Sequence, residues 1–248
     1  MELGMIREMS WIGDMAVSGR IRGVALVFHD LGCTEAKASP NTVELEWAKA
    51  GWLVVFPYYG PWSWMNRQAR SFVDNLVDAV YEQFELSNSI PLAATGNGMG
   101  GLAALLYARY SRRAVSACMV LAPVCDLANQ CKEKPELARS IHHAFLGYEE
   151  NEDILYAEHS PLAQAAQMPD IPYLIIHGDQ DQTVSKAAHS DKLVAALRGH
   201  GHHIEYMEIA GMGHDSCVPM IVPLKMIQFL ARLPKKPVTP SPSALVII

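Results

Sequence analysis

The 248-residue chain is 50% hydrophobic and 19% charged, which is typical of a globular protein large enough for one undivided domain. Its formal net charge of −6 disfavours binding to nucleic acid. Charged residues interrupt the first 15 positions, and no apolar run reaches the roughly 18 to 20 residues of a membrane span, so we expect neither a signal peptide nor a membrane partner.

The predicted elements alternate along the chain. Short apolar runs, typical of strands buried on both faces, occupy residues 23–29, 51–59, 90–96, 114–123 and 171–178, and a further strand is predicted over 203–209. Amphipathic segments with helical spacing lie at 41–51, 66–85, 101–111 and 185–201, before a closing helix over 216–233. This alternation predicts a three-layer α/β sandwich around a mostly parallel, doubly wound sheet. At the start, residues 5–11 and 14–19 suggest a hairpin that turns near Gly13.

Two segments depart from this alternation within the single domain expected over residues 1–233. Residues 126–170 separate two strands and contain helical patterns, so we expect a small helical insertion. It could be a cap over a binding site or a pair of surface helices with no part in binding. Residues 234–248 are rich in proline and predict a carboxyl-terminal tail. The sequence does not indicate an oligomeric state.

The glycine-dense stretch "ATGNGMGG", residues 94–101, fits two motifs. As GxGxxG over residues 96–101, it would be the phosphate-binding turn of a dinucleotide site. That interpretation is weak, because two predicted strands come earlier and the next acidic residue, Asp126, is too distant to bind the ribose. As GxSxG, the stretch would be a nucleophile elbow in which Gly98 takes the place of the serine.

An elbow requires an acid after a later strand and a histidine near the carboxyl terminus. "IHGDQDQTV" places Asp181 just after an apolar run, and "GMGHD" places His214 in a loop after the last strand. Together with "FHDLGCT" and "TGNGMGG", in this order, the chain resembles the α/β-hydrolase superfamily. Within it, the chain is most similar to esterases and to the prolyl-oligopeptidase-like, dienelactone-hydrolase-like branch.

The resemblance implies a serine-hydrolase constellation that acts on a small ester or a short peptide, without a cofactor or metal. Asp181 would orient His214, which would act as general base and then as general acid, and Asp179 is a competing choice for the acid. The backbone amides of Met99 and of Leu31 or Gly32 would form the oxyanion hole. Asp30 departs from the His-Gly pair that is frequent in such oxyanion loops.

Gly98 suits an elbow that demands positive φ, but it carries no atom that could attack a carbonyl carbon. Whether this chain is an active enzyme is therefore open. Three explanations remain: an engineered or natural loss of the nucleophile in a hydrolase, a natural non-catalytic relative that binds a small ligand, or activation of a water by His214.

Other residues invite functional interpretations of their own. The loop "PYYGPWSWMN" is either a packed surface loop or the wall of a substrate pocket that would contain Tyr58, Tyr59, Trp62 and Trp64. "HGHH", residues 200–203, lacks a carboxylate or Cys at ligand spacing, so we predict no metal site. The five cysteines include no CxxC pair, which disfavours a disulfide framework and predicts a cytoplasmic location.

Overall fold

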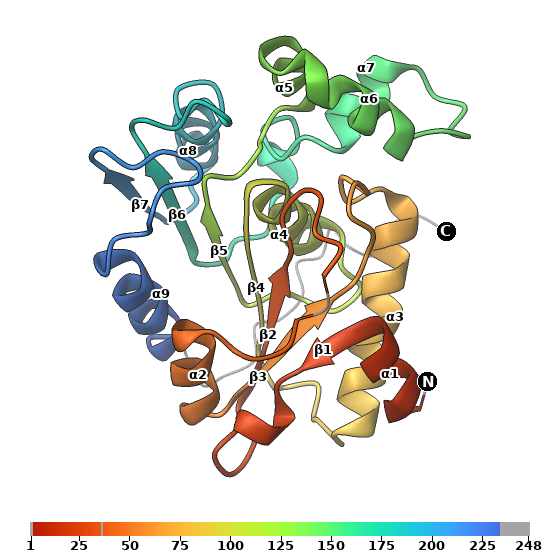
Figure 1. Ribbon diagram of the computed structural model, residues 1–248, viewed down its shortest axis with the longest axis vertical. Coiled ribbons are helices and arrows are strands. Elements are labelled where there is room, and N and C mark those ends of the chain that lie inside the picture. The colour runs from red at the N-terminus through yellow and green to blue at the C-terminus, as the bar shows by residue number, and fades with distance from the viewer. Residues whose placement is uncertain (1, 36, 234–248) are drawn as a thin grey trace.

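The computed structural model describes residues 2–35 and 37–233, so the predicted tail over 234–248 lies outside the described residues. Its strands form one sheet in the order β1-β3-β2-β4-β5-β6-β7, in which only β1 runs antiparallel to its neighbour (Figure 1). The strands are β1 (Ser10–Ile12), β2 (Gly23–Phe28), β3 (Trp52–Pro57), β4 (Leu92–Asn97), β5 (Ala117–Leu121), β6 (Tyr173–Gly178) and β7 (Ile204–Ile209). The mostly parallel sheet that the sequence predicts is thus confirmed.

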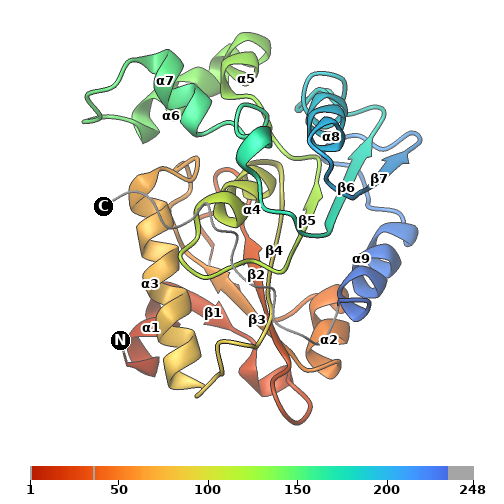
Figure 2. The same ribbon diagram turned by 180° about the vertical axis from the view of Figure 1, so that it is seen from behind.

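Helices cover both faces of this sheet, because alternate side chains of each inner strand point to opposite sides. In β2, for example, Val24 and Leu26 enter one core and Ala25 enters the other. The helices on the larger core include α1, α3, α4 and α8, while α2 and α9 cover the opposite face (Figures 1 and 2). Their bounds are α1 (Leu3–Met9), α2 (Thr42–Lys49), α3 (Arg67–Gln83), α4 (Gly98–Tyr110), α8 (Ser190–Gly199) and α9 (Ile221–Ala231).

Asparagine side chains fix the starts of α2 and α3. The Asn41 side chain accepts a hydrogen bond from the Glu44 amide at 3.0 Å, and Glu44 accepts one in return from the Asn41 amide at 2.9 Å. Asn66 likewise accepts from the Ala69 amide at 2.9 Å. Because these bonds satisfy backbone donors that have no partner inside a helix, they explain why the predicted segments begin at these asparagines.

The hairpin expected over residues 5–19 is wrong. Residues 3–9 form α1, Ser10–Ile12 pair with β3, and a short 3-10 helix, η1 (Asp14–Ala16), follows. The edge of β3 offers a row of unpaired backbone groups to β1, whereas a two-stranded hairpin is only marginally stable by itself. The helix α1 is held by the fully buried Ile6, whose carbonyl also accepts a hydrogen bond from the Ser10 hydroxyl at 2.7 Å.

The insertion between β5 and β6 folds into three short helices and a 3-10 turn, α5 (Leu127–Glu133), α6 (Pro135–Ala144), α7 (Glu152–Glu158) and η2 (Ala165–Gln167). The three helices lie beyond the carboxyl ends of the central strands, above α4 (Figure 1). Parallel α/β sheets place their binding sites at this edge. The insertion predicted from sequence is therefore present, at the functional end of the sheet.

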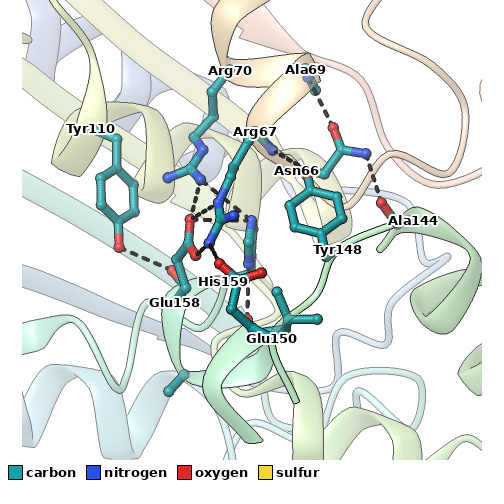
Figure 3. A network of polar contacts seen from close by, with 12 residues as sticks. Asn66, Arg67, Ala69, Arg70, Tyr110, Ala144, Tyr148, Glu150, Glu158 and His159 are labelled. Carbon is teal, nitrogen blue, oxygen red and sulfur yellow. Dashed lines mark hydrogen bonds and ion pairs between the residues drawn. The ribbon is translucent and has the colours of Figure 1, made fainter. Parts of the chain in front are cut away.

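A polar network fastens this insertion to the first turns of α3 (Figure 3). Arg67 and Arg70 both bind the Glu158 carboxylate, and Arg67 also reaches Glu150 at 2.8 Å. Asn66 donates a hydrogen bond from its side-chain amide to the Ala144 carbonyl at 2.8 Å. Burial opposes the charge on Glu158, but the hydrogen bonds from the two arginines lower its pKa to about 2.

We expect Glu158→Gln to destabilise the fold by about 1 to 2 kcal/mol at neutral pH, since it leaves the partly buried Arg70 without its anion. The folded-state pKa lies below the reference value of 4.5, so this stabilisation is present above that pH and is lost as the pH falls towards 2. Urea denaturation at pH 7 and pH 3 would measure both effects.

The matched control is Glu152→Gln on the same helix, because the Glu152 side chain is 60% exposed and its ion-pair partner, His142, is exposed as well. We expect its effect to stay below about 0.5 kcal/mol. Equal losses in the two variants would contradict the assigned role of Glu158.

Candidate active site

The glycine-dense stretch forms a tight turn from β4 into α4. Gly98 opens the helix with a φ of +54°, a left-handed conformation that side chains disfavour. Gly100 packs against the neighbouring strand so closely that a Cβ there would lie 2.4 Å from the Phe28 carbonyl oxygen. The turn therefore requires glycine at Gly100 for space and favours it at Gly98 for conformation.

The structure brings Asp181 and His214 together, as expected. The buried Asp181 accepts hydrogen bonds through Oδ1 from the Thr183 and Val184 amides at 2.9 and 2.8 Å. Its Oδ2 lies 2.7 Å from Nδ1 of His214. Asp179, the competing choice for the acid, instead accepts from the Gly211 amide at 2.7 Å. Asp181 is therefore the carboxylate that orients His214.

A second histidine, His177, contacts the Asp181 carboxylate from within the core. Its Nε2 lies 3.3 Å from Oδ2 of Asp181 and 2.9 Å from the Val184 carbonyl, while its Nδ1 is 2.6 Å from the Ser190 hydroxyl. With its proton on Nε2, the ring donates to both oxygens and accepts from Ser190. His177 is not among the residues predicted from the sequence, although it lies in the buried strand β6, four positions before Asp181.

The backbone amides of Leu31 and Met99, the expected oxyanion-hole donors, both donate to the same side-chain oxygen of the protein. Oδ1 of Asp30 accepts hydrogen bonds from Leu31 at 2.7 Å and from Met99 at 2.8 Å. The Gly32 amide is engaged elsewhere, with the Pro61 carbonyl at 2.8 Å. The two donors expected to bind a substrate oxygen thus hold the Asp30 carboxylate.

Asp30 also fills the space above Gly98 and faces His214. A Cβ on Gly98 would lie 2.4 Å from Oδ1 of Asp30, well inside contact distance. Its second oxygen, Oδ2, is 3.8 Å from Nε2 of His214 and 3.4 Å from the side-chain amide of Asn97. Residue 98 cannot carry a side chain while Asp30 occupies this position.

Two carboxylates therefore flank His214 and control its charge. Burial opposes the imidazolium, but hydrogen bonding to Asp181 and Asp30 outweighs burial and raises the pKa of His214 to about 10. Burial would likewise raise the pKa of Asp181, yet hydrogen bonds from His177, His214 and the Val184 amide hold it below its usual range. At neutral pH His214 is consequently a proton donor.

Comparison with known proteins agrees with this geometry. The model of the prolyl oligopeptidase family matches residues 66–232, which is more than half of the chain. The chain belongs to the prolyl oligopeptidase family. A search of curated proteins finds no match. The match explains why β4, β6 and the loop after β7 bring Gly98, Asp181 and His214 to one edge, as the α/β-hydrolase fold does.

Solved structures of this fold superpose on nearly the whole chain. Acylaminoacyl peptidase from Pyrococcus horikoshii has a TM-score of 0.76 and 14% identity over 96% of this chain and 41% of its own. A puromycin hydrolase gives 0.71 and 17% identity, covering 86% of this chain and 34% of its own. Dipeptidyl peptidase 4 from Porphyromonas gingivalis gives 0.67 and 15%, with 90% and 33% covered. This chain thus spans about two fifths of the length of the first of these proteins and about one third of the length of the other two.

The candidate active site opens into a cavity of about 190 Å³ between the sheet edge and the insertion. Asp30, Gly98 and His214 lie on its wall, and the insertion contributes Gln130 and Leu137. Gln130 is fully buried, and its Oε1 has no hydrogen-bond partner within the described part of the chain. A buried acceptor without a partner is costly to the fold.

The four aromatic residues of the loop after β3 differ in burial and in contacts. Trp64 is buried and lines the cavity, and its indole donates to the Ser140 hydroxyl of the insertion at 3.2 Å. Tyr59 stacks on His29 at 4.0 Å and donates to its carbonyl, so it supports the loop that carries Asp30. Tyr58 accepts from the Lys37 amide, and Trp62 is 51% exposed. Of these four residues, Trp64 is the one in the cavity wall.

Among residues 2–35 and 37–233, no helix combines the length and the apolar composition of a membrane span. Within the same residues, no group of three or more His, Cys, Asp and Glu side chains could hold a metal ion.

The charge on His214 can be tested by nuclear magnetic resonance of its ring. We expect the ring to titrate near pH 10, and Asp181→Asn to lower its pKa more than Asp30→Asn, because Asp181 lies at 2.7 Å and Asp30 at 3.8 Å. A wild-type midpoint near the ordinary value of 6.5 would contradict the arrangement of the two carboxylates.

Proposed function

We propose that this chain is a hydrolase domain of the serine esterase and peptidase type that has lost its nucleophile at position 98. Its cavity would take a small ester or a short peptide, and the chain would cleave such acyl substrates at most very slowly. The absence of its serine typically lowers the rate of such a site by about six orders of magnitude. Five free cysteines fit a reducing compartment such as the cytoplasm.

The mutual fit of Asp30 and Gly98 carries this proposal. The carboxylate occupies the volume of a residue-98 side chain and takes both amide donors of the expected oxyanion hole. A substrate carbonyl oxygen would have to displace a charged acceptor from these donors, and such charge-assisted hydrogen bonds are the stronger ones. Acyl transfer in this site therefore lacks both its nucleophile and its free oxyanion hole.

The same fit favours a native glycine over an experimental replacement of a serine. In a parent chain with serine at position 98, the Asp30 carboxylate could not occupy its present position, because its oxygens lie 2.4 and 2.7 Å from the Cβ position. A deliberate inactivation would change one residue and leave the family's usual glycine in the oxyanion loop. Asp30 and Gly98 instead suit each other as a pair.

The remaining constellation supports the serine-hydrolase origin. Asp181 is positioned to hold the imidazole through Nδ1, which leaves Nε2 directed at the volume above Gly98. In the proposed ancestral site, His214 Nε2 would accept the serine proton and later give it to the leaving group. Removing the Asp30 charge would lower the pKa of His214 towards the value a general base requires.

The test restores both positions together. We expect Asp30→Gly combined with Gly98→Ser to cleave p-nitrophenyl acetate at least about a hundredfold faster than the wild type, since nucleophile, base and oxyanion hole are then all present. Labelling of the introduced serine by a fluorophosphonate probe, detected by mass spectrometry, would show that its hydroxyl forms the covalent bond.

Each single variant serves as a control. Gly98→Ser alone should remain inert and lose about 1 to 3 kcal/mol of stability, because its side chain collides with Asp30 in a strained turn. Asp30→Gly alone should bind no fluorophosphonate at position 98. A folded double variant that neither reacts with the probe nor cleaves the ester would overturn the proposal.

A further inference from the structure

We propose that the Asp30 carboxylate is itself a nucleophile, and that this site opens small epoxides to diols through an ester formed on Asp30. This activity goes beyond the proposed loss of acyl hydrolysis, because it uses a different attacking atom and a substrate with a tetrahedral electrophilic carbon.

The two oxygens of Asp30 have different surroundings. Oδ1 is fixed by the amides of Leu31 and Met99, at 2.7 and 2.8 Å. Among the described residues, the polar contacts of Oδ2 are the long ones to Asn97 and His214, at 3.4 and 3.8 Å, and the side chain as a whole is 37% exposed. One oxygen is therefore held in place while the other remains available for attack, on a residue that lines the cavity.

Carboxylates are established enzymatic nucleophiles, and at a tetrahedral carbon they form a stable ester. In such an ester, Oδ2 would carry the substrate carbon and Oδ1 would be the carbonyl oxygen. Since Oδ1 already sits between two amide donors, these donors are in place to stabilise the negative charge that develops on it during ester hydrolysis.

The protonation state of His214 determines which leaving group the site can accept. At neutral pH its ring carries a proton on Nε2, facing the volume beside Oδ2. An epoxide oxygen needs a proton as its carbon–oxygen bond breaks, whereas a halide would leave without one. Protonation of the epoxide oxygen also converts His214 into the neutral base that the second step requires, so a protonated His214 matches an epoxide substrate.

In the first step, an electron pair of Oδ2 forms a bond to one epoxide carbon. The bond between that carbon and the ring oxygen breaks, its electron pair stays on the oxygen, and this oxygen takes the proton from His214 Nε2. The product is a hydroxyalkyl ester of Asp30 beside a neutral His214, with Asp181 still holding Nδ1.

In the second step, His214 Nε2 takes a proton from water, and the resulting hydroxide attacks Cγ of Asp30. The charge gathers on Oδ1, between the Leu31 and Met99 amides. Collapse breaks the bond between Cγ and Oδ2, and the leaving diol oxygen takes the proton of the new carboxyl group. Asp30 returns as a carboxylate and His214 as an imidazolium, so the sum is epoxide plus water to diol.

The cavity suits a small substrate with an apolar part. Trp64, Val124, Leu137 and Val184 contribute apolar walls to its volume of about 190 Å³. Gln130 and Thr183 add polar groups to the lining.

The experiment follows styrene oxide in water labelled with heavy oxygen. The mechanism moves Oδ2 of Asp30 into the diol and one water oxygen into Asp30. We therefore expect a single turnover to give unlabelled diol and a peptide containing Asp30 that is heavier by one oxygen label, measured by mass spectrometry. Labelled diol with an unlabelled Asp30 would show direct attack by water and overturn the proposal, as would a wild-type rate no higher than the background.

Variants separate this activity from the proposed function. Asp30→Asn keeps the size of the side chain and should lower kcat/KM for styrene oxide by about a thousandfold or more, with circular dichroism reporting its fold. Asp170→Asn, in a side chain that is 92% exposed, should leave the rate unchanged. An unchanged rate in a folded Asp30→Asn variant contradicts the proposal.

The two activities can fail independently. The combined Asp30→Gly and Gly98→Ser variant should lose epoxide opening while gaining ester cleavage. If it gains ester cleavage but the wild type never opens epoxides, the proposed function stands and this inference falls. If the wild type opens epoxides with label in Asp30 but the double variant stays inert on esters, this inference stands and the proposed function falls.

Discussion

The hydrogen bonds from the Leu31 and Met99 amides to one oxygen of Asp30 are the interaction on which the rest of the site depends. They join the loop after β2 to the start of α4, two segments that are far apart in the chain and adjacent at the sheet edge. They also place a negative charge at the amino-terminal end of α4, where backbone amides and the helix dipole favour an anion. The loop, the turn and the helix are thus held by one carboxylate.

A chain of polar groups extends from that carboxylate into the core. His214 stands between Asp30 and Asp181, His177 supports Asp181, and the Ser190 hydroxyl binds His177. Each inner member is almost fully buried, so each needs its neighbour to offset the cost of leaving water. Removal of Asp181 or His214 would therefore leave buried partners unsatisfied, which gives both residues a structural role in this site.

Much of this could be predicted from the sequence. Unbroken apolar runs predict the buried strands. The pairing of Asp181 with His214 comes from the resemblance of the motifs after two of these strands to those of α/β hydrolases. The place of Asp30 could not be predicted in the same way, because a side chain in a loop takes its direction from contacts distant in sequence. A signal existed nonetheless: an acid where glycine is usual and a glycine where serine is usual, in two motifs that meet at one point. The helix α1 escaped prediction because a single buried side chain, Ile6, anchors it.

The close approach of Asp30 to position 98 also couples these two residues. A serine at position 98 would bring its Cβ within 2.4 Å of Oδ1 of Asp30, so the carboxylate would have to leave its present place and release the Leu31 and Met99 amides. A substitution at either position therefore changes the free-energy cost of a substitution at the other, and the two positions are expected to vary together in relatives that share this loop.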